Sequence, residues 1–220
     1  MAPDPTIDRR RRTVDGRRPA NGVTRMADRA DRPAVIDVLR LFAERGDRHD
    51  GEAVTQTAHA LQTAEAARAS GAADELVAAA LLHDIGHLVR DAADGPVGDP
   101  EADDQHEAVG ARWVAPRFGP GVARPIALHV LAKRYRCTVD PGYRAGLSPT
   151  SERTLQVQGG PLTGSEVAGF ERTPGFGDAV LLRGWDEGGK VEATGATDIE
   201  GFRPLLESVA RRWGRRAGRW

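Results

Sequence analysis

The sequence predicts an all-α fold that forms a single domain. Apolar residues recur at the spacing of helix turns, first in Val35, Val38, Leu39 and Phe42. No segment alternates apolar and polar residues over the length of a strand, and the sequence contains no internal repeat. A chain of 220 residues is long enough to bury one substantial core. We therefore expect a bundle of helices around a single core.

Helix start and stop signals place the elements of the first half. Four helices follow one that begins near Ala34, and they cover 52–70, 75–90, 104–118 and 120–135. Asp74 is expected to cap the helix over 75–90. Residues 91–103 are rich in Gly, Pro and Asp, which predicts a loop.

The second half of the chain begins with a different pattern. Residues 136–162 contain many Pro and Gly residues and predict a long irregular segment, which at this length favours a functional loop or lid. Thr163 and Glu166 have the spacing of a capping box that opens a short helix. The last two helices run from Pro174 to about Gly188 and from about Asp198 to Trp213.

The ends of the chain differ from its middle. Residues 1–32 contain nine Arg and five Asp with few apolar residues, which favours a disordered basic arm. The domain is expected over 33–213, followed by a basic tail over 214–220. Neither end interleaves basic residues with several aromatic ones, so we expect no nucleic-acid partner.

The composition excludes several classes of protein. The single cysteine, Cys137, cannot form an internal disulfide or a cysteine-type zinc site. No apolar run reaches the roughly 20 residues needed to cross a bilayer, and no signal-peptide pattern follows the N-terminal arginines. We expect a cytoplasmic protein without a membrane partner, and we leave the oligomeric state open.

The most informative feature is the doublet His83-Asp84 in an apolar, helix-like run. A buried imidazole or carboxylate must be paired or must bind a metal. The chain has only six histidines: His59 lies 24 residues before His83, and His106 and His129 follow at intervals of 23. Several helices would therefore bring imidazoles to one place, which indicates a site for two metal ions.

Asp84 is expected to bridge these two metals. The other ligands divide into two sets, with His59, His83 and Asp186 on one metal and His106 and His129 on the other. The second metal would keep open positions, as a catalytic metal does. Imidazole and carboxylate without thiolate suit iron, manganese or zinc. For each residue taken alone, the alternative is an ordinary core histidine or an exposed Asp186.

The doublet and its co-ligands resemble the HD-domain superfamily, which is named after such a His-Asp pair. The resemblance implies a helical HD-domain bundle and a metal set formed by His59, His83, Asp84 and Asp186. His106 and His129 match the additional pair of members that hold two metals. Most members are phosphohydrolases, so metal-dependent hydrolysis of a nucleotide or phosphomonoester is the alternative function. A non-catalytic regulatory HD module is a further alternative.

Several stretches resemble a narrower family, the HD-type mixed-valence di-iron oxygenases that cleave carbon–phosphorus bonds. myo-Inositol oxygenase is a distant relative of this family. These stretches are 57–62, 81–88, 128–135, 147–161 and 179–190. The resemblance implies two iron ions, Fe(II) and Fe(III), with O2 as co-substrate in phosphonate catabolism. The substrate would be a small organophosphonate, either 1-hydroxy-2-aminoethylphosphonate or its trimethylammonio analogue. The products would be phosphate and glycine or glycine betaine.

The resemblance also implies residues that bind the substrate. His87, one turn after His83, and Lys133 would act in catalysis by contacting the phosphonate. The remaining candidates are Glu52 for a substrate ammonium and Ser151, Thr154 and Arg183 for the phosphonate. A solvated Lys133 and ordinary turn chemistry at Ser151 and Thr154 are the alternatives.

One position departs from the family pattern. Relatives carry a Tyr ten residues before the first ligand histidine, where it can occupy iron until substrate arrives. This chain has His49 at that position. An imidazole there would be an extra metal ligand or an exposed residue near Asp47 and Asp50.

Overall fold

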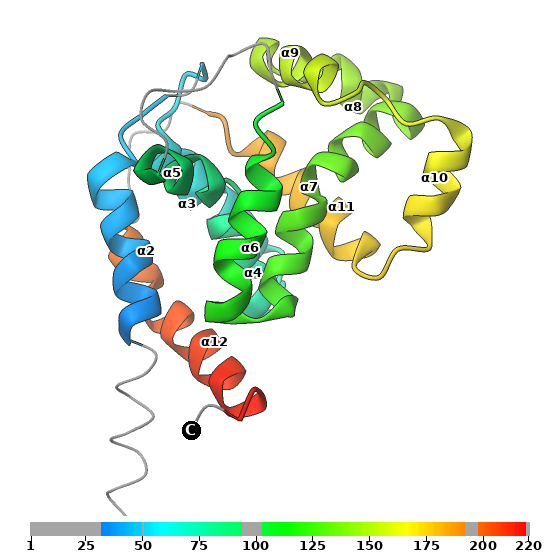
Figure 1. Cartoon of the computed structure of the whole chain (residues 1–220). Helices are drawn as coiled ribbons and strands as arrows, with labels where there is room; N and C mark the ends of the chain where they lie inside the picture. The colour runs from blue at the N-terminus through cyan, green and yellow to red at the C-terminus, as the bar shows by residue number, and fades with distance from the viewer. Residues whose placement is uncertain (1–31, 50, 94–102, 192–197, 219–220) are drawn as a thin grey trace, which may run out of the picture.

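The fold was analysed in a computed structural model that describes residues 32–49, 51–93, 103–191 and 198–218 (Figure 1). Every regular element in these ranges is helical, which confirms the all-α prediction. The elements are α2 (Arg32–Arg45), α3 (Gln56–Ala69), α4 (Asp74–Leu82), α5 (Ile85–Ala93), α6 (His106–Phe118), α7 (Pro120–Val139), α8 (Pro141–Ala145), α9 (Pro149–Val157), α10 (Gly164–Glu171), α11 (Phe176–Gly188), η1 (Ile199–Phe202) and α12 (Arg203–Arg216). The expected basic arm lies outside the described residues apart from Arg32.

α4 forms the centre of the bundle. All seven residues from Leu76 to Leu82 are buried, because this helix is apolar on every side. α3, α7, α11 and α12 pack around it, and α7 also contacts α6 (Figure 1). The main apolar cluster draws side chains from all of these helices and from α2. The metal-binding candidates therefore emerge from helices that share one rigid core.

The helix expected over 75–90 is two helices, α4 and α5, with a break at His83 and Asp84. Adjacent residues of a continuous α-helix point roughly 100° apart. The break lets both side chains of the doublet face the same cluster. Asp74 is the first residue of α4 rather than its cap, which is Ala73. Its charge still lies at the positive end of the helix dipole.

The prediction of an irregular segment over 136–162 was wrong, since most of it is helical. α8 begins with Pro141 after Asp140, and α9 begins with Pro149 after Ser148. In each case the capping side chain accepts a backbone N–H three residues later, and proline suits the first helical position. α8, α9 and α10 extend to one side of the bundle (Figure 1).

The remaining boundaries differ less. The capping box of Thr163 and Glu166 is present at the start of α10, as predicted. The last helix is preceded by the short element η1 and continues to Arg216, so it enters the expected tail.

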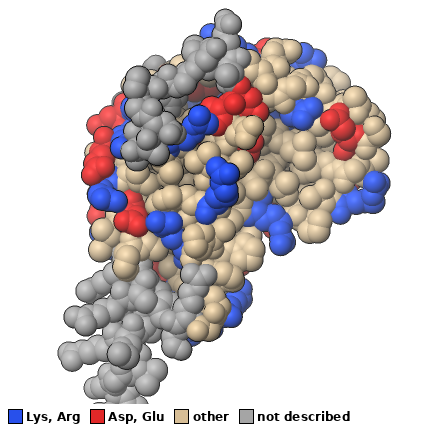
Figure 2. All heavy atoms as spheres, in the orientation of Figure 1, with Lys and Arg blue, Asp and Glu red and all other residues tan. Residues whose placement is uncertain are grey.

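No helix within the described ranges has the length and apolar content that would span a bilayer. On the face in Figure 2, Lys and Arg side chains are scattered among other residues rather than gathered in one patch.

Candidate metal centre

Six predicted ligands from five places in the chain meet in the interior. His59 comes from α3, the doublet from the α4–α5 break, and Asp186 from the last turns of α11. His106 is the first residue of α6, and His129 lies in the middle of α7. The four histidines and Asp186 are at most 8% exposed. The structure thus brings together the six residues that the sequence predicted as ligands of the two metals.

The first set of donors surrounds one point. The Nε2 atom of His59 lies 3.1 Å from that of His83 and 3.2 Å from Asp186 Oδ1. Asp84 Oδ2 lies 3.6 Å and 3.3 Å from the same two nitrogens. Donors that share a metal through bonds of about 2.0–2.2 Å stand at such separations.

The second set uses the other oxygen of Asp84. Its Oδ1 atom lies 3.5 Å from Nε2 of both His106 and His129, and these two nitrogens are 3.2 Å apart. Asp84 therefore turns one oxygen to each set, which is the geometry of a carboxylate that bridges two metals. The second set has three protein donors, so a metal there would keep open positions.

The hydrogen bonds at the opposite nitrogen of three of these rings direct their Nε2 atoms to the candidate metal positions. Nδ1 lies 2.9 Å from the Gly189 carbonyl in His59, 2.8 Å from Ala80 O in His83 and 2.7 Å from Ile126 O in His129. A carbonyl only accepts, so each Nδ1 carries a proton, and in the neutral ring Nε2 presents a lone pair. Lone pairs facing each other at 3.1–3.2 Å repel unless a proton or a metal ion lies between them. The donor chemistry thus fits a pair of metal ions.

The ionisation of the cluster also favours metal binding. Burial raises the pKa of the Asp84 carboxyl, but the imidazoles of His83 and His129 outweigh burial and hold that pKa well below its usual range. Burial likewise opposes ionisation of Asp186, and Arg183 and His83 lower its pKa despite it. Two ionised carboxylates thus face the imidazoles, and metal ions would compete with protons for the same donors.

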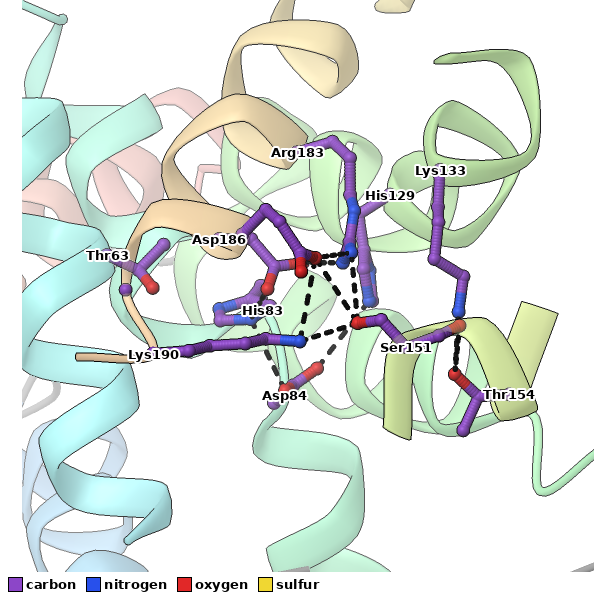
Figure 3. Close-up of polar contacts among 12 residues, drawn as sticks. Thr63, His83, Asp84, His129, Lys133, Ser151, Thr154, Arg183, Asp186 and Lys190 are labelled. Atoms are coloured by element: carbon purple, nitrogen blue, oxygen red, sulfur yellow. Dashed lines mark hydrogen bonds and ion pairs between the residues drawn. The ribbon is translucent and has the colours of Figure 1, made fainter. Parts of the chain in front are cut away.

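Lys133 and helix α9 lie on the side of the site away from Thr63 (Figure 3). The Lys133 ammonium is buried and donates to Thr154 Oγ1 on α9 at 2.9 Å. Burial and the nearby charges of Arg183 and Lys190 lower the pKa of Lys133 to about 8. Ser151, also on α9, points its hydroxyl toward the same space. The two α9 residues predicted to contact substrate therefore lie beside the metal donors.

Arg183 is buried and directs its donors to protein groups. It bonds Asp186, Glu187 and the hydroxyl of Tyr143, and it lies 3.5 Å from Ser151 Oγ. The bond to Asp186 leaves the other oxygen of that carboxylate facing the histidines. Arg183 thus orients a candidate ligand, while its contact with a phosphonate stays a prediction.

Glu52 is already paired. Its Oε1 atom accepts from Lys190 Nζ and from Ser148 Oγ, both at 2.9 Å. Lys190 also donates to Ser151 Oγ at 2.6 Å and lies 3.6 Å from Glu187 (Figure 3). The carboxylate predicted to meet a substrate ammonium therefore has an ammonium of the chain beside it.

A cavity of about 110 Å³ lies between these groups. Its walls include all the predicted substrate contacts: Glu52, His87, Lys133, Ser151, Thr154 and Arg183. His49 also lines it and is exposed, so a role as an extra ligand remains a prediction. Gln158 contributes an amide oxygen that is buried without a hydrogen-bond partner.

Sequence reasoning missed three charged residues of this region. Lys190 follows the Gly-rich end of α11, Glu187 lies one residue after Asp186, and Asp104 lies two residues before α6, at the first position of the helix expected over 104–118. Asp104 bonds both His87 and His106. The signal for Glu187 was its spacing of four residues from Arg183. Lys190 and Asp104 gave no comparable signal.

Comparison with known proteins agrees with this geometry. The model of the HD domain family matches residues 53–157, which contain five of the six candidate ligands. The chain is 45% identical over 174 residues to the hydroxymethylphosphonate dioxygenase of Gimesia maris, covering 79% of this chain and 87% of that one. It is 37% identical over 170 residues to the [1-hydroxy-2-(trimethylamino)ethyl]phosphonate dioxygenase (glycine-betaine-forming) of Leisingera caerulea, covering 77% and 86%.

Proposed function

The chain belongs to the HD-domain family of phosphonate dioxygenases, and we propose that it cleaves the carbon–phosphorus bond of hydroxymethylphosphonate. Hydroxymethylphosphonate and O2 would give formate, phosphate and a proton. The observation that carries this proposal is the pair of donor sets joined by Asp84, in a chain with 45% identity to a hydroxymethylphosphonate dioxygenase.

One feature favours a one-carbon substrate. The carboxylate of Glu52 is balanced by Lys190, so an ammonium at C2 of a larger substrate would have to compete with an internal one. The 2-amino and 2-trimethylammonio compounds predicted from the sequence remain the second candidates, because Glu52 does line the cavity and a relative at 37% identity is named for the trimethylamino compound.

We further propose that the metals are iron, as a mixed Fe(II)/Fe(III) pair. His59, His83, Asp84 and Asp186 would hold one ion, and Asp84, His106 and His129 the other. Imidazole and carboxylate donors suit iron, manganese and zinc, and the oxygenase function selects a redox metal among them. When bound, the two irons would supply the binding and reduction of O2, which no amino-acid side chain supplies.

The side chains around the cavity would bind and orient the phosphonate. Lys133 would place its buried ammonium against the phosphonate oxygens, with Thr154 and Ser151 as neutral donors from α9. His87, which also lines the cavity, would contribute a further contact. α9 would also exclude water, since Ser148 and Thr150 bond Glu52 and Gly51 across the mouth.

The test is phosphate and formate release after loading with Fe(II) under argon, partial oxidation, and exposure to air. We expect hydroxymethylphosphonate to be turned over with a higher kcat/KM than either two-carbon compound, and Asp84→Asn to be inactive. A preference for a two-carbon compound would overturn the substrate assignment while leaving C–P cleavage in place. Oxygen-independent hydrolysis of phosphomonoesters with no turnover of any phosphonate would favour the phosphohydrolase instead.

A further inference from the structure

The four candidate histidine ligands do not have the same partner at Nδ1. In His59, His83 and His129 this nitrogen faces a backbone carbonyl. In His106 it lies 2.8 Å from a carboxylate oxygen, Asp104 Oδ1. An ionised carboxylate is a stronger acceptor than a carbonyl and makes the imidazole a stronger metal donor.

The same carboxylate reaches a second imidazole. Asp104 Oδ2 lies 2.9 Å from Nδ1 of His87, which lines the cavity on α5. The rings of His87 and His106 stack with centroids 4.1 Å apart and planes inclined by 18°. Asp104 therefore holds a candidate substrate contact and a candidate metal ligand side by side through its two oxygens.

Asp104 is itself fixed by both helices. The Arg90 guanidinium, one turn after His87 on α5, donates to the Asp104 backbone carbonyl. The backbone N–H of His106, the first residue of α6, donates to Asp104 Oδ1 at 3.2 Å. A carboxylate held in this way presents its oxygens to the two rings without the freedom of a loop side chain.

We propose that Asp104 is a positioning residue that sets the tautomer of His106 and orients the rings of both His106 and His87, and so couples the second metal to the phosphonate-binding wall. Because Nδ1 of His106 donates to Asp104, Nε2 of that ring is left as an acceptor. In His106 that atom faces the second metal position. The part of this inference that concerns His87 rests on the proposed function, and the part that concerns His106 rests on the metal geometry alone.

The test is a metal titration of the full chain, followed by steady-state kinetics. In Asp104→Ala both ring contacts are lost, and we expect one of the two metals to bind about 10–100-fold more weakly while the other keeps its affinity. KM for the phosphonate should rise more than kcat falls. Asp104→Asn keeps an acceptor for the N–H of His106, so it preserves the start of α6 if the alanine variant fails to fold.

Two further variants separate positioning from a structural role. Asp103→Ala removes an exposed carboxylate from the same turn and should leave both metals and KM unchanged. His87→Ala should raise KM and leave both metal affinities in place. Wild-type affinity for both metals in Asp104→Ala and Asp104→Asn would overturn the proposal, as would a third bound metal in the wild type that these variants lose. If no phosphonate is turned over by any variant, the titration still decides the role of Asp104 at His106.

Discussion

The backbone of Gly86 on α5 lies directly against the backbone of His106 on α6. A Cβ atom placed on Gly86 would stand 1.9 Å from the His106 carbonyl oxygen. A Cβ atom placed on Gly110, one turn further along α6, would stand 3.1 Å from the amide nitrogen of Gly86. The distance between the doublet and His106 is therefore set by two glycines.

Gly86→Ala should disrupt the second donor set. The added methyl must push α6 away, and overpacking of this kind costs about 1–3 kcal/mol of unfolding free energy. We expect a lower melting temperature and loss of one metal of the two. Gly169→Ala is the matched control, because nothing lies within 4 Å of the added Cβ in α10. That variant should gain up to about 1 kcal/mol. If Gly86→Ala still bound two metal ions per chain, the packing argument would be contradicted.

The lowered pKa of Lys133, about 8, predicts a pH-dependent KM. The ammonium is charged below this pKa and loses its charge as the pH rises through it. The loss of a charge-assisted hydrogen bond to the phosphonate should raise KM about tenfold between pH 7 and about pH 9. kcat should change less. Lys133→Arg stays charged across this range, so its KM should be nearly flat. A wild-type KM that is equally independent of pH over this range would exclude Lys133 from phosphonate binding.

Arg183→Lys should weaken the first metal. Arginine bonds Asp186, Glu187 and Tyr143 at once, and lysine cannot reproduce this planar fork. With Asp186 no longer oriented, we expect about tenfold weaker binding of one metal, measured by titration. Tyr143→Phe removes one of the three contacts and should have a smaller effect. Unchanged affinity in Arg183→Lys would show that Asp186 is oriented without it.

Lys190→Met should shift substrate preference. It removes the ammonium beside Glu52 and leaves a carboxylate that a substrate ammonium can neutralise. Turnover of the aminoethyl compound should therefore gain in kcat/KM relative to turnover of hydroxymethylphosphonate. Lys190→Arg keeps the charge and should leave this ratio close to that of the wild type. A ratio that does not move in Lys190→Met would mean that Glu52 has no part in selecting the substrate.

The candidate ligands could be predicted because their residue types are costly to bury. The doublet His83-Asp84 has no place in an apolar run unless it is paired or binds a metal. With few histidines in the chain, His59, His106 and His129 were the available partners. Their approach in the structure follows from one shared core.

Other features could not be predicted, for different reasons. The break between α4 and α5 interrupts a continuous apolar pattern that contains neither Pro nor Gly at the break itself. Asp104 and Lys190 act through tertiary contacts between loops and helices. The spacing of apolar and polar residues along the sequence contains no signal for such contacts. The helices α8 and α9 were missed although Asp140 and Ser148 each precede a proline, a recognised start signal that Gly-rich surroundings obscured.

The most direct test of the central claim is the stoichiometry of oxygen uptake during turnover of hydroxymethylphosphonate by the iron-loaded chain. An oxygen electrode and a phosphate assay on the same reaction should give one O2 consumed for each phosphate and each formate formed. Removal of oxygen should stop phosphate release. Phosphate formed at the same rate under argon, or with no oxygen consumed in air, would contradict the assignment of a dioxygenase to this site.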